Sequence, residues 1–80
     1  MTLTLNGQVR ELEGLDDGAA LDAVIAALDL KADRIAVEWN GEIVPRTQWP
    51  ATAVHSADRL EVVHFVGGGA PALVPGVARL

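Results

Sequence analysis

The side chains of this 80-residue chain that could take part in chemistry are few and scattered. Cysteine is absent, which excludes a disulfide framework, a thiolate metal site, an iron–sulfur cluster and a cysteine nucleophile. His55 and His64 are the only histidines, too few for a zinc site, which typically takes about three or four protein ligands. Ser56, the only serine, lacks the G-x-S-x-G context of a serine nucleophile. An independent enzyme is therefore the least favoured function.

Three consecutive glycines, Gly67, Gly68 and Gly69, are the most unusual feature of the sequence. Without Cβ atoms they form the thinnest and most flexible peptide available, which suits a chain end that enters a narrow active site. A plain flexible linker is the alternative interpretation. A phosphate-binding loop is excluded, because no Lys-Ser/Thr pair follows the glycines and no helix begins there.

The segment before the glycines predicts a strand over Leu60–Val66 with two different faces. Leu60, Val62 and His64 share one face, and Glu61, Val63 and Phe65 share the other. The charge of Glu61 marks the second face as the solvent side, so Val63 and Phe65 are predicted to be exposed apolar residues just before the glycines. The alternative is that single exposed apolar residues on a strand need no explanation.

Two Asn-Gly pairs predict two hairpins, because this dipeptide favours the tight turn that joins antiparallel strands. The strand pairs are Met1–Leu5 with Gln8–Leu12, and Ile35–Trp39 with Glu42–Val44.

An apolar stripe with helical spacing, formed by Leu21, Val24, Ile25 and Leu28, predicts the main helix over Ala19–Leu28. Asp16 or Asp17 is expected to cap its first turn. A short helical turn is predicted over Arg46–Trp49, between Pro45 and Pro50. Trp39 and Trp49 are interpreted as packing residues near this turn.

The order of these elements, without a regular βαβ repeat, indicates the α+β class. One domain is expected over residues 1–66, followed by a glycine-rich arm and extension over residues 67–80. The net charge of −5 argues against nucleic acid as a partner, since no excess of cations is present. The lack of a signal sequence, of cysteines and of a spanning segment favours a cytoplasmic protein without membrane contact.

Three segments together resemble a known family: the opening TLNG, the stretch VEWNGEIVPRTQW, and the ending LEVVHFVGGG. They are similar to the small sulfur-carrier proteins of thiamin biosynthesis (ThiS-like), and the resemblance covers residues 1–69. It implies the β-grasp fold of ubiquitin, with a mixed sheet of about four to five strands packed on one main helix.

The resemblance also implies a mechanism in which the protein is a co-substrate and sulfur donor without a bound cofactor. A ubiquitin-activating-type adenylyltransferase (ThiF-like) would use ATP to adenylate the carboxylate of Gly69. Sulfur from a donor such as a cysteine desulfurase would then give a thiocarboxylate for a thiazole synthase (ThiG-like). Gly67 and Gly68 would be the stem of the arm, and Val63 and Phe65 would belong to the docking face.

The sequence departs from the family after Gly69, where the eleven residues Ala70–Leu80 follow. An amide to Ala70 prevents adenylation of Gly69, so a processing protease is expected to remove this extension. Pro71 and Pro75 disfavour helix and strand there, which predicts a disordered, cleavable segment. The alternatives are a carrier for another pathway, such as molybdopterin synthesis, an inactive homologue that works by binding alone, or a β-grasp binding module without sulfur chemistry.

Overall fold

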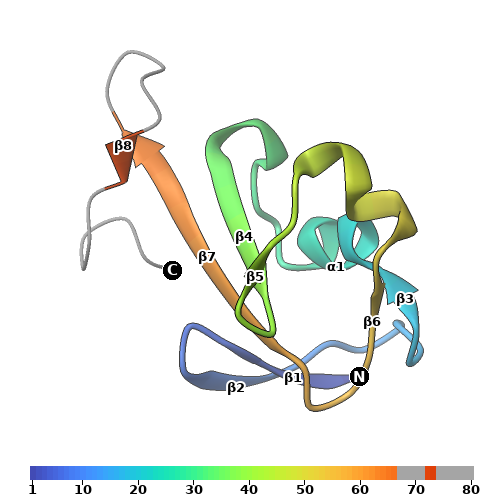
Figure 1. Ribbon diagram of the computed structural model, residues 1–80. Helices are drawn as coiled ribbons and strands as arrows, with labels where there is room; N and C mark the ends of the chain where they lie inside the picture. Colours follow the sequence, from blue (N-terminus) through green and yellow to red (C-terminus); the bar gives the residue numbers. More distant parts are fainter. Residues whose placement is uncertain (67–71, 74–80) are drawn as a thin grey trace.

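Two hairpins and one long strand build the main sheet of the computed structural model, which describes residues 1–66 and 72–73, without the side chains of 32, 65, 66, 72 and 73. β1 (Thr2–Leu5) and β2 (Gln8–Glu11) form the first hairpin. β4 (Ile35–Trp39) and β5 (Glu42–Ile43) form the second. β7 (Arg59–Val66) lies between the two hairpins, so the strand order is β2-β1-β7-β4-β5 (Figure 1).

Both hairpins turn at the predicted Asn-Gly pairs. The φ angles are 50° at Asn6 and 81° at Gly7, and 49° at Asn40 and 87° at Gly41. Consecutive left-handed residues are what a tight turn needs to match the twist of its strands, and asparagine and glycine adopt this conformation at least cost. The two predicted hairpins are confirmed.

The sheet is mixed, as the α+β class implies. β1 runs parallel to β7, with Leu5 opposite Leu60, whereas β4 runs antiparallel to β7 over its whole length. The first strand of the chain is therefore adjacent to the last long one. A parallel pair cannot be joined by a tight turn, and here the helix lies in the connection.

The main helix is shorter than predicted: α1 spans Leu21–Ala27. Ala19–Ala20 form strand β3, which pairs with β6 (Ala53–Val54) in a second, two-stranded sheet. Alanine has a high helix propensity, but the backbone groups of this pair are used by β6 instead. The predicted aspartate cap is wrong, because the N-cap residue is Ala20 and no side chain caps the helix.

Two short 3₁₀ segments complete the connections: η1 (Ala32–Arg34) and η2 (Arg46–Ala51). The helical turn after Pro45 is confirmed, although it continues through Pro50 instead of ending there. Gln48 N donates to Pro45 O and Thr52 N to Trp49 O, so these bonds need no N–H from Pro50.

The core lies between α1 and one face of the sheet, and η2 and the β3–β6 pair lie beside the helix (Figure 1). The predicted stripe faces it, since Leu21, Val24, Ile25 and Leu28 are all buried. The sheet contributes Leu3, Leu5, Ile35, Val37, Leu60 and Val62, and the connections contribute Leu12, Val44, Trp49 and Val54. Trp49 is a core residue as expected, and half-buried Trp39 packs against the core.

A short strand is present beyond the glycines, where the prolines predicted none. β8 (Ala72–Leu73) pairs antiparallel with the end of β7, with Val66 opposite Ala72 and Phe65 opposite Leu73. It lies between Pro71 and Pro75, so neither proline has to supply an N–H inside the strand. In the described part of the chain, no helix is long and apolar enough to cross a membrane.

Candidate functional site

β7 carries the residues that the sequence singles out, and the predicted core residues Leu60 and Val62 are buried, whereas Val63 is half-buried instead of exposed. Leu60 and Val62 have no exposed surface and belong to the core. Glu61 and Val63 lie on the opposite face, which we call the outer face, and both are half-buried. β7 is the central strand, and Val63 is paired directly with Ala36 of β4, which limits its exposure.

The remaining predicted site residues fall outside what the structure describes. This holds for Gly67, Gly68 and Gly69 and for the side chain of Phe65. The backbone of Phe65 is described as part of β7, two residues after Val63.

The outer face presents a mixed surface. Ile43, Glu38 and Glu61 lie in one row across β5, β4 and β7, and the side chain of Ile43 is 74% exposed. A shallow hollow of about 220 Å³ beside this row is lined by Glu38, Gly41, Arg59 and Glu61. This volume is below the range of about 300–1,000 Å³ usual for small-molecule pockets. The face suits contact with a protein better than capture of a metabolite.

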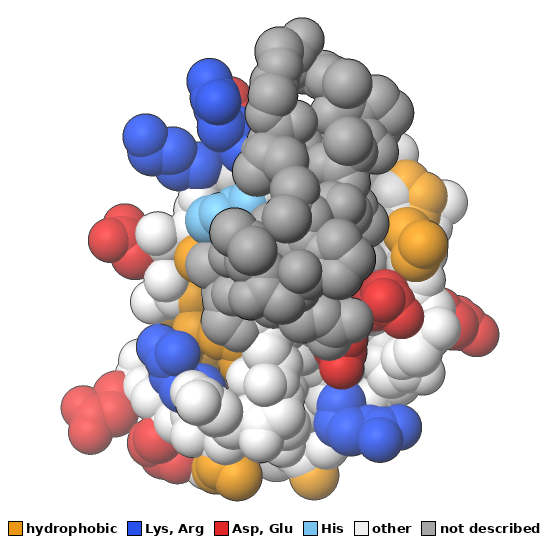
Figure 2. Space-filling view, turned by 90° about the vertical axis from the view of Figure 1, so that its left-hand side faces the viewer, with side chains coloured by type: hydrophobic (Ala, Val, Ile, Leu, Met, Phe, Trp, Pro, Cys, Tyr) orange, Lys and Arg blue, Asp and Glu red, His pale blue; other side chains and the backbone are white. Residues whose placement is uncertain are grey.

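Charged and apolar side chains also alternate on the side of the molecule where β8 lies. Figure 2 shows acidic, basic and hydrophobic side chains around the grey residues on this side. Such a mixture is typical of the rim of a protein interface.

Two asparagine side chains contact β7 in its first half, which no sequence pattern predicts. Asn6 Nδ2 donates to Val62 O at 3.0 Å, and Val62 N donates to Asn6 Oδ1 at 2.8 Å. Asn40 Oδ1 accepts from Arg59 N at 2.9 Å. The Asn-Gly motif predicts only the turns, and no local signal shows where the asparagine amides point.

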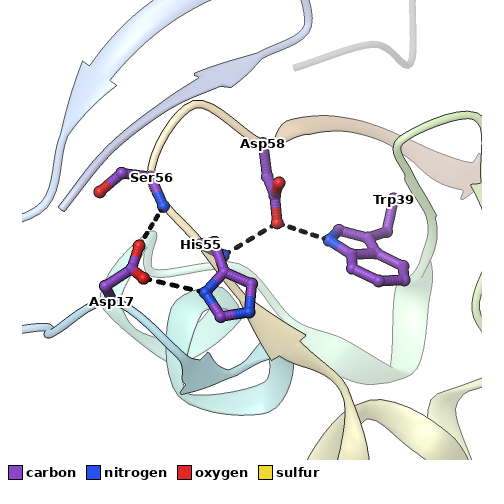
Figure 3. Close-up of polar contacts among 5 residues, drawn as sticks. All are labelled: Asp17, Trp39, His55, Ser56 and Asp58. Atoms are coloured by element: carbon purple, nitrogen blue, oxygen red, sulfur yellow. Dashed lines mark hydrogen bonds and ion pairs between the residues drawn. The ribbon is translucent and has the colours of Figure 1, made fainter.

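A polar cluster at the opposite end of β7 joins the 55–58 turn to its surroundings (Figure 3). Asp17 accepts from Ser56 N at 2.5 Å and contacts His55 Nδ1 at 2.9 Å. Asp58 accepts from His55 N and from Trp39 Nε1, both at 2.8 Å. The carboxylates therefore tie together the loop before β3, the turn and β4.

The electrostatics of this cluster follow from its hydrogen bonds. The backbone N–H of Ser56 and the ring of His55 lower the pKa of Asp17, and the Asp17 carboxylate raises the pKa of His55. Partial burial pushes the pKa of Asp58 upward, but the hydrogen bonds from His55 N, Trp39 and Asn40, with the charge of His55, together outweigh it and the pKa is lowered. These bonds fix the turn that begins β7.

No metal centre is formed by the described residues, in which no group of three His, Asp or Glu side chains is placed to hold an ion. His55 is a surface residue bonded to Asp17, and His64 is half-buried on β7. The described residues hold β7, the strand that the glycines follow in sequence, and form a sheet around it.

The chain is similar to a protein family and to several known proteins. The model of the ThiS family matches residues 3–69. The Bacillus subtilis protein named sulfur carrier protein ThiS is 31% identical over 67 residues, which are 84% of this chain and 98% of that protein. A protein of Paramagnetospirillum magneticum named thiazole synthase is 36% identical over 69 residues, which are 86% of this chain. The match spans only 20% of that relative.

The solved structures include a crystal structure of the thiamine biosynthesis protein ThiS from Geobacter metallireducens. It matches with a TM-score of 0.74 and 33% identity, over 85% of this chain and 99% of that one. The β-grasp fold expected from the sequence is thereby confirmed, with a mixed sheet of five strands and one main helix.

Proposed function

Since this chain belongs to the ThiS family, we propose that it is a sulfur carrier of thiamin biosynthesis, acting as a co-substrate and not as a catalyst. One observation carries the proposal. The family match ends at Gly69, the last of the three glycines that follow β7. Three residues without side chains after the central strand of a small, well-anchored sheet make a slim arm on a rigid base.

The proposed chemistry takes place at the carbonyl carbon of Gly69. Its carboxylate oxygen attacks the α-phosphorus of ATP on the partner adenylyltransferase, and pyrophosphate leaves. Hydrosulfide then attacks the carbonyl carbon, AMP leaves with the bonding electron pair, and loss of the sulfur-bound proton gives a thiocarboxylate, whose sulfur is nucleophilic. Where a cysteine desulfurase supplies the sulfur as a persulfide, the first product is an acyl disulfide, and a thiol reductant must cleave its S–S bond to release the thiocarboxylate. Covalent activation of this kind divides one difficult substitution into two easier ones.

Processing must precede these steps in the chain as given, because Gly69 is bonded to Ala70. An amide carbonyl has no oxygen free to attack ATP. We propose that a protease cleaves after Gly69 and removes residues 70–80, β8 included.

The outer face around Val63 and Phe65 is the proposed docking surface for the adenylyltransferase and for the acceptor of the sulfur. The mixed row of Ile43, Glu38 and Glu61 supports this, because a partner can find apolar and charged contacts on one side of the sheet. A thiazole synthase is the proposed acceptor. The relative with that name contains a region similar to this chain, which supports the choice.

The proposal is tested by reconstitution with a chain that ends at Gly69, a ThiF-like adenylyltransferase, ATP and a sulfide source. The expected product is a chain whose intact mass shows one oxygen exchanged for sulfur. The matched control ends at Ala70 and is expected to react far less well, because a Cβ then lies at the reacting end. In the same assay, Phe65→Ala should raise the carrier concentration required. A trimmed chain that keeps its mass would contradict the carrier function.

A further inference from the structure

The side-chain amide of Asn6 makes the hydrogen bonds to β7 that the backbone of a longer β1 would make. β1 ends at Leu5, and its parallel pairing with β7 reaches only Leu60. The backbone continues the ladder for one more bond, since Asn6 N donates to Leu60 O at 2.9 Å. The chain then turns at Asn6, where φ is 50°, to begin the hairpin.

The two next bonds of a parallel ladder can be stated from its geometry. A residue in such a pair donates to one residue of the neighbouring strand and accepts from the residue two positions further along. Since Asn6 N donates to Leu60 O, an extended Asn6 would accept from Val62 N through its own carbonyl. A continuing strand would then supply an N–H to Val62 O.

The carboxamide of Asn6 supplies both of these groups. Its Oδ1 accepts from Val62 N at 2.8 Å and its Nδ2 donates to Val62 O at 3.0 Å. A carboxamide has the same donor and acceptor groups as a peptide bond, so the substitution is chemically complete. The pairing of β7 with the β1 side is thus extended by two residues, from Leu60 to Val62.

We propose that Asn6 is a positioning residue for the sulfur-carrier reaction: its amide fixes the backbone of β7 at Val62 and so directs the docking residues and the glycine arm towards the partner enzyme. The inference rests on the proposed function. Val62 directly precedes Val63, the first proposed docking residue, so loss of the Asn6 bonds would leave this part of β7 held from the β4 side alone.

Asn40 provides a matched control within the same chain. It occupies the same position in the second Asn-Gly turn, with φ of 49°, and its amide also contacts β7. Its contact is at Arg59, the first residue of β7, and consists of one accepted bond. Changes at Asn40 therefore perturb an equivalent turn without releasing the part of β7 next to the arm.

The first test measures hydrogen exchange of backbone amides in the full chain. In Asn6→Gly the turn is retained, because glycine accepts positive φ, but both bonds to Val62 are lost. The exchange of the Val62 amide should rise by about tenfold or more, which is the scale of one to two net hydrogen bonds. In Asn40→Gly the Val62 amide should keep its protection. Equal Val62 exchange in the two variants would overturn the inference.

The second test uses the pH profile of Asn6→Asp. A protonated carboxyl has an O–H donor and a C=O acceptor, as the amide does, whereas a carboxylate only accepts and faces Val62 O unfavourably. The folded chain therefore favours the protonated form. Protection of Val62 should be present below the pKa of the new carboxyl and lost as the pH rises through it. In Asn40→Asp the new carboxyl lies beside Arg59 N, which favours its ionised form, and beside the Asp58 carboxylate, which disfavours it. Neither contact involves Val62, so Val62 protection should not follow the ionisation of this residue.

The third test measures adenylation of chains that end at Gly69. Asn6→Gly should raise KM for the carrier by about threefold to tenfold with little change in kcat, since a misdirected arm weakens productive docking. Asn40→Gly should leave KM within about twofold of the unsubstituted chain. Unchanged KM in Asn6→Gly, with the unsubstituted chain active, would overturn the positioning role and leave the carrier function standing. An inactive unsubstituted chain would instead contradict the carrier function, while the exchange tests still decide the role of Asn6 at Val62.

Discussion

Asp17 shows how a residue with a clear local signal can serve another purpose. As an acidic residue shortly before an apolar helical stripe, it has the sequence signature of a helix cap. In the structure its two oxygens bind His55 and Ser56, which follow it by nearly forty residues in the chain. A local pattern cannot reveal this partner, because the 55–58 turn reaches Asp17 only through the fold.

The pair of Asp17 and His55 predicts a pH dependence of stability. Asp17 raises the pKa of His55 in the folded chain above its unfolded value of about 6.5. The contribution of the pair to stability is therefore complete below the unfolded pKa and is lost as the pH rises through the folded pKa. The pKa of Asp17 is lowered, so the contribution also falls when the pH drops through that value. Both side chains are largely exposed, which keeps the effect small.

Urea unfolding of the unsubstituted chain and of His55→Gln between about pH 5 and pH 8 measures this dependence. The difference in the free energy of unfolding between the two chains should be largest at the acidic end of that range and shrink towards pH 8. NMR titration of His55 in Asp17→Asn should show a lower pKa than in the unsubstituted chain. A difference in stability that grows with pH would contradict the pairing.

Among the elements, β7 links the core to the arm. Leu60 is fully buried on it, and truncation to alanine leaves a cavity next to α1 and β1. Leu60→Ala should therefore destabilise the chain by about 2–5 kcal/mol. Ile43→Ala, at a site that is 74% exposed, should change the stability by less than about 0.5 kcal/mol.

Urea unfolding of the two variants measures this difference in the free energy of unfolding, provided that their m-values are equal. If Ile43→Ala lost as much stability as Leu60→Ala, the outer face would have to be buried in solution.

β8 gives the end of β7 a partner that processing would remove. Its pairs with Phe65 and Val66 adjoin the glycines directly. Termination of the chain at Gly69 should therefore speed amide exchange in the Phe65–Val66 segment, while Val62, held by Asn6, keeps its protection. Comparison of the two chain lengths by NMR measures this effect. Unchanged protection at Phe65 and Val66 would show that β8 does not hold them in solution.

The elements also show where sequence reasoning succeeds. Alternation and the Asn-Gly pairs predict both hairpins and the inner face of β7, because these features depend on neighbours in sequence. The parallel pairing of Leu5 with Leu60 and the strand at Ala19–Ala20 depend on contacts distant in sequence, so the pattern alone misses them. The contact of the Asn6 amide with Val62 is equally distant in sequence, so no local pattern predicts it.

At the scale of the whole molecule, β7, the strand that precedes the glycines in sequence, lies at the centre of the sheet. β7 has β1 on one side and β4 on the other, and the first strand of the chain is one of these neighbours. β7 is therefore held by both hairpins. The net charge of −5 leaves the chain without the excess of cations that binding to a phosphate backbone requires.

The central claim is that the carbonyl of Gly69 carries sulfur, and intact-mass analysis of the chain recovered from its own cells tests it most directly. The account predicts a species that ends at Gly69, of which a fraction has one oxygen exchanged for sulfur. Recovery only of species in which Gly69 is still bonded to Ala70 would contradict it.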